Sequence, residues 1–378
     1  MIQAATGILI AYLITFFLLP FIIRIAQINK IFDMPDERKT HTYPISSLGG
    51  IAIFSGLVIS LLLVSDFMSV NAQFQYFLAA FFVIFILGVI DDIFILKAWK
   101  KIVGQLLVSG LITMKAHLIV TNLQGFLGFY EISETTGYMI TFFSIILLIN
   151  AFNLIDGVDG LAASLGLLSS VLFGVFFLIN NQPAYGVLGF TMAGTLLAFL
   201  IYNFPPARIF MGDSGSTLIG LVNAILAIRF IETASYGPVM PIASPAALAF
   251  GALLIPLMDV LRVIIIRVAK RRSPIAPDRN HLHHLLQMKG FSHTGVTITL
   301  LLSSLFISSV SFILQGMQIH AILAIQFLLY FGGIGALIYL VPDQNMLHIV
   351  SDEMIIDEEA KVYPIYNSTK DKISSGEE

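Results

Sequence analysis

Long runs of apolar residues, separated by short polar connections, fill most of the chain up to residue 341. A helix that crosses a bilayer needs roughly 20 consecutive, mostly apolar residues. Eleven runs approach that length, at residues 4–24, 48–65, 74–90, 102–120, 137–152, 161–180, 184–203, 214–231, 244–268, 295–315 and 319–341. The pattern predicts an all-α polytopic integral membrane protein with about eleven transmembrane helices.

The composition supports this class. Hydrophobic residues make up 57% of the 378 residues and charged residues 11%. A soluble domain carries about a quarter charged residues, so a soluble globular protein is excluded. The net charge of −3 argues against a nucleic-acid binder. The absence of cysteine excludes disulfides, zinc–thiolate sites and cysteine nucleophiles.

The basic residues are distributed unevenly between the two sides of the predicted membrane domain. With the N-terminus outside, 18 of the 20 Lys and Arg residues fall in the odd-numbered connections or the C-terminal tail, and Lys115 and Arg229 fall on the other side. Positive charge marks the cytoplasmic side. No basic residue precedes Arg24, so we expect the first run to be a retained span rather than a cleaved signal. A ten-span alternative would leave the three lysines of the tail outside.

Two regions of different character follow from this pattern. We expect residues 1–341 to form the transmembrane domain, whose cytoplasmic loops carry every dense polar cluster. Residues 342–378 hold nine acidic residues and three lysines. We expect them to form an acidic, loosely ordered cytoplasmic tail.

The densest polar cluster, residues 150–162, lies between two apolar runs and holds two aspartates, two asparagines and two glycines. Polar groups at this depth are costly unless they face water, a metal or a ligand. Asp156 and Asp159 share a face if the segment is helical. Gly157 and Gly160 instead permit an irregular turn.

Two further acidic positions adjoin apolar runs. Asp91 and Asp92 follow one run directly, and such a pair suits a divalent cation or proton transfer, or marks a helix end that reaches water. Asp213 lies in a turn of small residues that opens another span, where its carboxylate could meet a hard cation. Ser214 and Ser216 beside it could cap the helix or bind phosphate.

The remaining cytoplasmic loops are basic. Lys39 and His41 could bind phosphate or could belong to an ordinary positive-inside loop. A longer loop carries several basic residues and three histidines: Lys270, Arg271, Arg272, Arg279, His281, His283 and His284. Zinc is one ligand for such histidines, but the basic surroundings favour an anion such as a pyrophosphate. Carboxylates for Mg²⁺ beside a basic shell suit phosphoryl transfer from a soluble anionic substrate to a lipid-borne one.

Four blocks together resemble a known family. Asp91-Asp92 and residues 150–162, 210–216 and 277–284 are similar, in the same order, to motifs of the polyprenyl-phosphate N-acetylhexosamine-1-phosphate transferases. The Pro-Asp-Arg-x-His-x-His-His form resembles the WecA/TagO branch rather than the MraY branch. Leu282, where isoleucine is usual, and Asn280 are small departures.

The resemblance implies a reaction and a location. GlcNAc-1-phosphate would pass from UDP-GlcNAc to undecaprenyl phosphate with release of UMP, as the first membrane step of a cell-envelope polysaccharide. The enzyme would be a multi-pass protein of the bacterial plasma membrane with its active site and C-terminus in the cytoplasm, and a homodimer is plausible. It would require Mg²⁺, with Mn²⁺ as a substitute.

The resemblance also implies roles for individual residues. Asp213 and Asn153 would bind Mg²⁺, and Asp91 and Asp92 would serve the attacking lipid phosphate. The nucleotide-sugar would be held by Asp156, Asp159, Asn203, Phe210, Lys39, His41, Arg267, Arg279, His281, His283 and His284. A phosphate monoester has a second pKa of about 6 and is mostly dianionic at neutral pH. We therefore expect Asp91 and Asp92 to position groups more than to remove a proton.

Two other functions fit parts of the pattern. A transporter of lipid-linked sugars would carry charges at mid-span and motifs on both faces, whereas here the charges crowd one face. The same phosphotransfer could use another UDP-N-acetylhexosamine or UDP-MurNAc-pentapeptide, because motifs define the chemistry better than the substrate.

Overall fold

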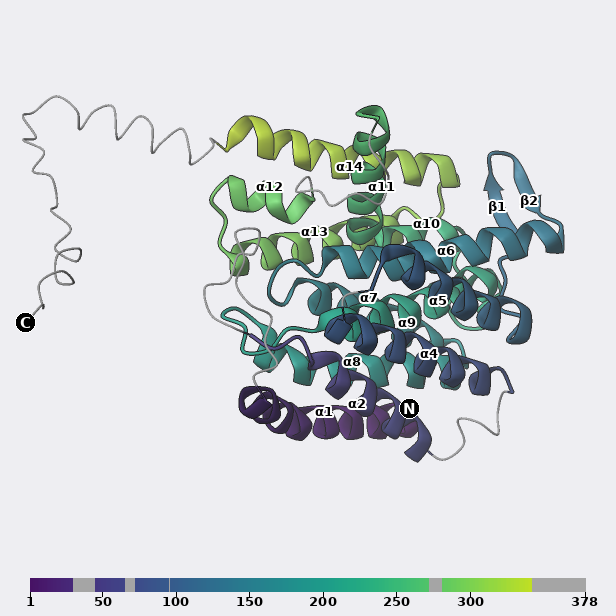
Figure 1. Cartoon of the computed structure of the whole chain (residues 1–378). Helices are drawn as coiled ribbons and strands as arrows, with labels where there is room; N and C mark the ends of the chain where they lie inside the picture. The colour runs from purple at the N-terminus through teal and green to yellow at the C-terminus, as the bar shows by residue number, and fades with distance from the viewer. Residues whose placement is uncertain (30–44, 65–71, 95, 272–280, 342–378) are drawn as a thin grey trace, which may run out of the picture.

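The computed structural model describes residues 1–29, 45–64, 72–94, 96–271 and 281–341 (Figure 1). Lys39, His41, Arg279 and the acidic tail over residues 342–378 lie outside these ranges.

Most described residues are helical, as the apolar pattern predicts. The helices are α1 (Ile2–Asn29), α2 (Gly49–Leu63), α4 (Gln73–Phe94), α5 (Ala98–Gly110), α6 (Glu134–Ile155), α7 (Leu161–Ile179), α8 (Pro183–Asn203), α9 (Gly212–Thr233), α10 (Pro245–Ala252), α11 (Leu254–Ala269), α12 (Leu282–Met288), α13 (His293–Ile313) and α14 (Ile319–Leu340). A π-helical turn, Leu111–Lys115, continues α5, and a 3₁₀ turn, Ala234–Tyr236, follows α9.

Each of the eleven predicted apolar runs coincides with a helix or with a pair of helices. Within the described ranges, eight helices are long and apolar enough to cross a membrane, or nine if the bent pair α10–α11 is one span. The 15-residue helix α2 and the 13-residue helix α5 are shorter. The prediction of an all-helical, polytopic membrane protein is confirmed.

Helix α9 forms the centre of the bundle, between α4, α6, α7 and α8 (Figure 1). It is buried along nearly its whole length, whereas α1 and α14 expose most of theirs. Glycines let neighbouring backbones come close to it. A Cβ at Gly220 would stand 2.7 Å from the Ile149 Cα of α6, and one at Gly88 of α4 would stand 2.5 Å from the Ser214 nitrogen. These contacts fix α4 and α6 against the N-terminal half of α9.

Helices α10 and α11 meet at an angle of 79°. Pro256 accounts for the break, because it lacks the N–H that would bond to the carbonyl of Ala252 four residues earlier. In Figure 1 α11 runs across the direction of the other long helices. The apolar run at 244–268 predicted a span but not this bend.

A short antiparallel hairpin, β1 (Asn122–Phe126) and β2 (Phe129–Glu131), connects the end of α5 with the start of α6. The apolar pattern places this segment between the runs 102–120 and 137–152 and does not predict a hairpin. Leu127 and Gly128 form the turn with φ of 52° and 82°, the left-handed pair that tight hairpins require. The Leu127 N–H donates to His320 Nε2 at 2.9 Å, which ties the turn to the start of α14.

Candidate functional site

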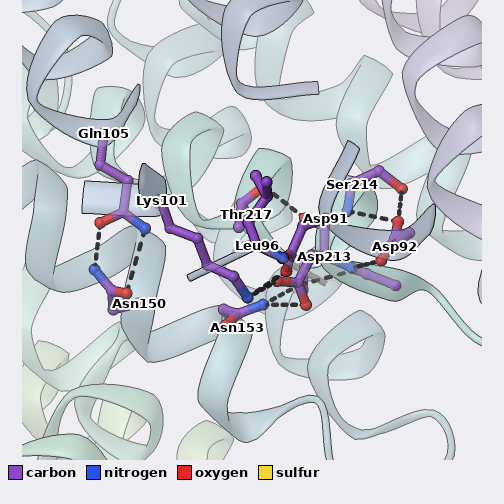
Figure 2. Close-up of polar contacts among 12 residues, drawn as sticks. Asp91, Asp92, Leu96, Lys101, Gln105, Asn150, Asn153, Asp213, Ser214 and Thr217 are labelled. Atoms are coloured by element: carbon purple, nitrogen blue, oxygen red, sulfur yellow. Dashed lines mark hydrogen bonds and ion pairs between the residues drawn. The ribbon is translucent and has the colours of Figure 1, made fainter. Parts of the chain in front are cut away.

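The carboxylate of Asp92 caps the N-terminus of α9. Its two oxygens accept hydrogen bonds from the N–H groups of Asp213 (2.7 Å) and Ser214 (3.1 Å) and from the Ser214 hydroxyl (2.7 Å) (Figure 2). Gly212 starts the helix with a φ of 72°, where a Cβ would stand 2.6 Å from Asp92 Oδ2. A negative group at this end also favours the helix dipole. Asp92 thereby fixes the position from which the Asp213 side chain leaves the helix.

Lys101 bridges the carboxylates of Asp91 and Asp213. Its ammonium group lies 2.6 Å from Asp213 Oδ2 and also forms an ion pair with Asp91 (Figure 2). The other Asp91 oxygen accepts the N–H of Leu96 at 2.5 Å. Burial opposes the charge on Lys101, but the two carboxylates, Asp213 most strongly, raise its pKa above the ordinary value. Two carboxylates from different helices thus share one cation.

Asn153, near the C-terminal end of α6, completes this cluster. Its amide donates to Asp213 Oδ1 at 2.9 Å and to the Ser216 hydroxyl at 3.0 Å. One turn earlier, Asn150 forms a paired amide contact with Gln105 of α5, at 2.8 and 3.3 Å (Figure 2). The last two turns of α6 therefore hold α5 and α9 together through side-chain amides. The predicted metal residues Asn153 and Asp213 are in contact with each other.

Asp156 and Asp159 have different surroundings, although they are three residues apart. Helix α6 ends at Ile155, and Gly160 turns the chain with a φ of 75°. Asp156 faces a cavity, and its pKa is raised well above the ordinary value by burial and by the charges of Asp213 and Asp92. Asp159 accepts the Ala207 N–H at 3.1 Å and lies 3.4 Å from His293. The helical alternative, in which both aspartates share a face, is wrong.

Two other residues expected at the nucleotide bind the protein backbone. The Asn203 amide accepts the Gly160 N–H and donates to the Ile209 carbonyl, both at 2.9 Å. The main chain of Phe210 bonds to Ser46 at 2.7 Å and to Gly49 at 3.0 Å. These bonds hold the α8–α9 connection against the start of α7 and α2. Asn203, Phe210 and Asp159 are not among the residues that line the cavity.

The histidine segment is attached to α11 by Asp259. His281 Nδ1 lies 2.8 Å from Asp259 Oδ2, and the Leu282 N–H donates to Oδ1 at 2.6 Å. The His281 and His283 rings are stacked, with centroids 5.6 Å apart. His283 is buried against Gly157, and burial together with the charge of His284 lowers its pKa to about 3. His283 is therefore neutral at physiological pH.

Some of these groups line a cavity of about 1070 Å³ between α5, α6, α11 and α12, whereas Asp91, Asp92 and Asp213 are not among its lining residues. Its polar lining includes Lys101, Asn150, Asn153, Asp156, Arg267, His281, His283 and His284. Its apolar lining includes Ile102, Leu106, Phe143, Leu147, Val263 and Ile264. The cavity thus joins a charged, amide-rich wall to a wall built from the apolar faces of three helices.

Two residues of this site are not among the predicted site residues. Lys101 is one of the 18 basic residues on the predicted cytoplasmic side, and nothing in the charge pattern distinguishes it from the others. Asp259 lies inside the apolar run 244–268 and is 0% exposed. An ionisable residue within a membrane-length run is itself a signal of function, and this signal could have drawn attention to Asp259.

The site lies at one end of the bundle. Helices α4 and α6 end there, and α5 and α9 begin there. The β1–β2 hairpin, which follows the C-terminal end of α5 and precedes α6, lies at the other end (Figure 1). Among the described residues, no group of three His, Asp or Glu side chains could hold a metal ion by itself.

Comparison with known proteins agrees with this arrangement. A sequence model of glycosyl transferase family 4 matches residues 74–231. The chain is 33% identical over 317 residues to a decaprenyl-phosphate N-acetylglucosaminephosphotransferase of Mycobacterium leprae (strain TN), covering 78% of this chain and 79% of the relative. It is 29% identical over 315 residues to the undecaprenyl-phosphate alpha-N-acetylglucosaminyl 1-phosphate transferase of Escherichia coli (strain K12), covering 82% and 83%. The resemblance inferred from the motifs is confirmed: the chain belongs to glycosyl transferase family 4, the family of these polyprenyl-phosphate N-acetylglucosaminephosphotransferases.

Proposed function

We propose that the protein transfers GlcNAc-1-phosphate from UDP-GlcNAc to undecaprenyl phosphate. An oxygen of the lipid phosphate forms a bond to the phosphorus that carries the sugar. The bond from that phosphorus to the bridging oxygen breaks, and UMP leaves with the electron pair. The products are undecaprenyl-pyrophosphoryl-GlcNAc and UMP. The activities for which the relatives are named support both the sugar phosphate and the polyprenyl acceptor.

The observation that carries the proposal is the two-sided lining of the cavity. Its apolar wall suits the isoprenoid chain of an acceptor that arrives from the membrane. Its polar wall offers Lys101, Arg267 and His281, which can bind phosphate oxygens. A reaction between a lipid phosphate and a soluble nucleotide requires both walls in one space.

The ion pairs support a positioning role for Asp91. Lys101 already neutralises part of its charge, and one of its oxygens is held by the Leu96 N–H. The lipid phosphate is mostly dianionic at neutral pH, since its second pKa is about 6. The proposed step therefore needs no base, and Asp91 orients Lys101 toward the reacting phosphates.

The chemistry of the donor set fits Mg²⁺. Asp213 and Asn153 carry carboxylate and amide oxygens on adjoining helix ends; the Asn153 NH₂ group donates to Asp213, and its amide oxygen would turn toward a bound ion. The ion pair between Lys101 and Asp213 supports the binding of a cation at this carboxylate. Two protein ligands are typical of Mg²⁺ that also binds substrate phosphates. When bound, the ion supplies Lewis-acid stabilisation of charge on the phosphoryl oxygens.

We also propose eleven membrane crossings, with the site and the C-terminus in the cytoplasm of a bacterial cell and the N-terminus outside. The distribution of 18 of the 20 basic residues supports this orientation. Helices α2 and α5 would then cross together with the flanking chain. A homodimer stays a prediction from the family resemblance.

A transfer assay with purified protein in detergent tests the reaction. It supplies Mg²⁺, undecaprenyl phosphate and radiolabelled UDP-GlcNAc, and it measures label extracted into butanol. We expect a labelled lipid that is lost with EDTA and in Asp213→Asn. The matched control is Glu232→Gln, because Glu232 is an acid at the other end of α9 that bonds to Thr121.

Other outcomes identify which part of the proposal fails. Label transferred from UDP-GalNAc or from the muramyl-pentapeptide nucleotide, but not from UDP-GlcNAc, would keep the reaction and change the donor. Equal loss in Glu232→Gln would contradict a specific role for Asp213. No labelled lipid with any of these donors would overturn the proposed function.

A further inference from the structure

Asp259 is a buried carboxylate with no assigned role. It lies in α11, six residues after the break from α10, and its side chain is 0% exposed. An isolated carboxylate in such a place is strongly destabilising, so its partners matter. They are the Leu282 N–H at 2.6 Å, His281 Nδ1 at 2.8 Å, and Arg262 Nη2, which lies one turn later at 3.5 Å.

The contact with His281 determines which ring nitrogen carries the proton. A carboxylate accepts hydrogen bonds, so the proton in the His281–Asp259 contact is on Nδ1. The stacked ring of His283 restricts rotation of the same ring. His281 also lines the cavity, and Nε2 on the opposite edge of its ring is left for the cavity.

We propose that Asp259 is a positioning residue that holds His281 in one tautomer and one orientation, so that Nε2 meets the phosphate groups of the bound substrates. A carboxylate that orients a histidine in this way is a recurrent arrangement in enzymes. Asp259 also has a structural role through the Leu282 contact, because the same carboxylate fixes the start of α12 to α11. The proposal rests on the proposed function in that it takes the cavity ligand to be a phosphate ester.

The same contacts also fit an alternative in which Asp259 has a purely structural role. Asp259 would then anchor α12, and its loss would lower stability without acting through the chemistry of the His281 ring. The variant Asp259→Asn distinguishes the positioning role from the structural role. The asparagine oxygen can still accept the Leu282 N–H, while its NH₂ group faces Nδ1 and favours the tautomer with the proton on Nε2.

The test combines histidine NMR with a double-mutant cycle. Protein labelled with ¹⁵N-histidine is compared with Asp259→Asn, and the His281 signals are identified by their loss in His281→Gln. We expect a protonated Nδ1 in the wild type and a protonated Nε2 in Asp259→Asn. We also expect kcat/KM to fall ~10–100-fold in Asp259→Asn, mostly in kcat, with partial recovery in Asp259→Glu.

The cycle shows whether Asp259 acts through His281. In the His281→Gln background, Asp259→Asn should cause no more than about a twofold further loss. The matched control for a lost buried hydrogen bond is Gln326→Met, because Gln326 bonds to Ala247 and Ser311 away from the cavity. It should lower thermal stability and leave kcat/KM within about threefold.

Three results would overturn the proposal: an unchanged tautomer in Asp259→Asn, the same loss in both backgrounds, or an equal loss in Gln326→Met. A wild type that transfers no sugar phosphate would overturn the proposed function by itself. The tautomer spectrum would still decide whether Asp259 orients His281.

Discussion

The ammonium group of Lys101 lies between two carboxylates that belong to different helices. Without it, Asp91 and Asp213 would repel each other at a partly buried site. We predict that Lys101→Met lowers kcat by ~10²-fold, the usual cost of removing one positioned donor from a reacting oxyanion. Its raised pKa keeps the ammonium charged up to a pH above the ordinary value of 10.5, so its contribution is lost only at strongly alkaline pH.

The neighbouring Lys100 provides the control. It lies one residue earlier, is exposed, and contacts the ring of Trp99. Transfer assays on purified Lys100→Met should give near wild-type rates. Equal losses in the two variants would mean that general positive charge, rather than the bridge, supports the reaction.

His283 makes the fold sensitive to acid. Its pKa is lowered from 6.5 to about 3 by burial and by His284. Between these values the unfolded chain binds a proton that the folded chain excludes. The contribution of neutral His283 to stability is therefore complete above pH 6.5 and falls by up to about 1.4 kcal/mol per pH unit between pH 6.5 and about 3. We predict that His283→Gln loses less stability than the wild type when the pH is lowered from about 7.5 to about 5.5.

Thermal unfolding in detergent at the two pH values measures this difference. The matched variant is His117→Gln, because His117 is an exposed histidine that contacts Tyr138 at the other end of the bundle. It should keep the acid sensitivity of the wild type. If His283→Gln shows the same pH dependence as the wild type, His283 is not excluded from protonation in the fold.

Much of the polar cluster could be predicted at the scale of residues. Asp91, Asp92, Asn153 and Asp213 stood out because acids and amides beside membrane-length apolar runs are costly. Lys101 did not stand out, since basic residues are common on the cytoplasmic side. The different surroundings of Asp156 and Asp159 depend on the turn at Gly160, which the sequence permits without requiring.

At the scale of elements, the start of α9 is defined by a side chain from α4. Asp92 accepts two N–H groups and a hydroxyl there. We predict that Asp92→Ala lowers the free energy of unfolding by about 1–2 kcal/mol, as for other lost helix caps. Because Asp213 follows the cap directly, we expect the transfer rate to fall as well. Thermal unfolding and the transfer assay measure the two effects.

Ser133 offers a helix cap for comparison. Its hydroxyl accepts the Thr136 N–H at 3.2 Å at the start of α6, at the opposite end of the bundle. Ser133→Ala should lower stability by a similar amount and leave the transfer rate unchanged. If Asp92→Ala instead abolishes transfer with no loss of stability, Asp92 acts on the substrate and not through the helix.

The apolar runs predicted the helices well because a bilayer demands a fixed length of apolar chain. Two features depend on contacts between elements and could not be predicted in this way. These are the hairpin tied to His320 and the attachment of the histidine segment to Asp259. The 79° bend at α10–α11 instead follows from Pro256, which the apolar pattern alone does not take into account.

For the whole molecule, the orientation in the membrane can be measured directly because the chain has no cysteine. Leu127 at the hairpin turn is 69% exposed, and Trp99 near the site is 61% exposed. In protoplasts, we predict that a membrane-impermeant maleimide labels Leu127→Cys at once and labels Trp99→Cys only after permeabilisation. The opposite order of labelling would invert the proposed topology.

The two walls of the cavity have a kinetic consequence. In the proposed reaction the acceptor is confined to a two-dimensional phase, while the nucleotide is dissolved in the aqueous volume. Binding of the acceptor to the apolar wall of α5, α6 and α11 would therefore depend on the mole fraction of acceptor in the surrounding lipid, and not on its concentration in the whole sample. Dilution with inert lipid should slow turnover at constant total acceptor, whereas a larger aqueous volume at constant nucleotide concentration should not. In the proposed reaction, the lipid composition of the membrane would therefore influence the rate at which the product forms.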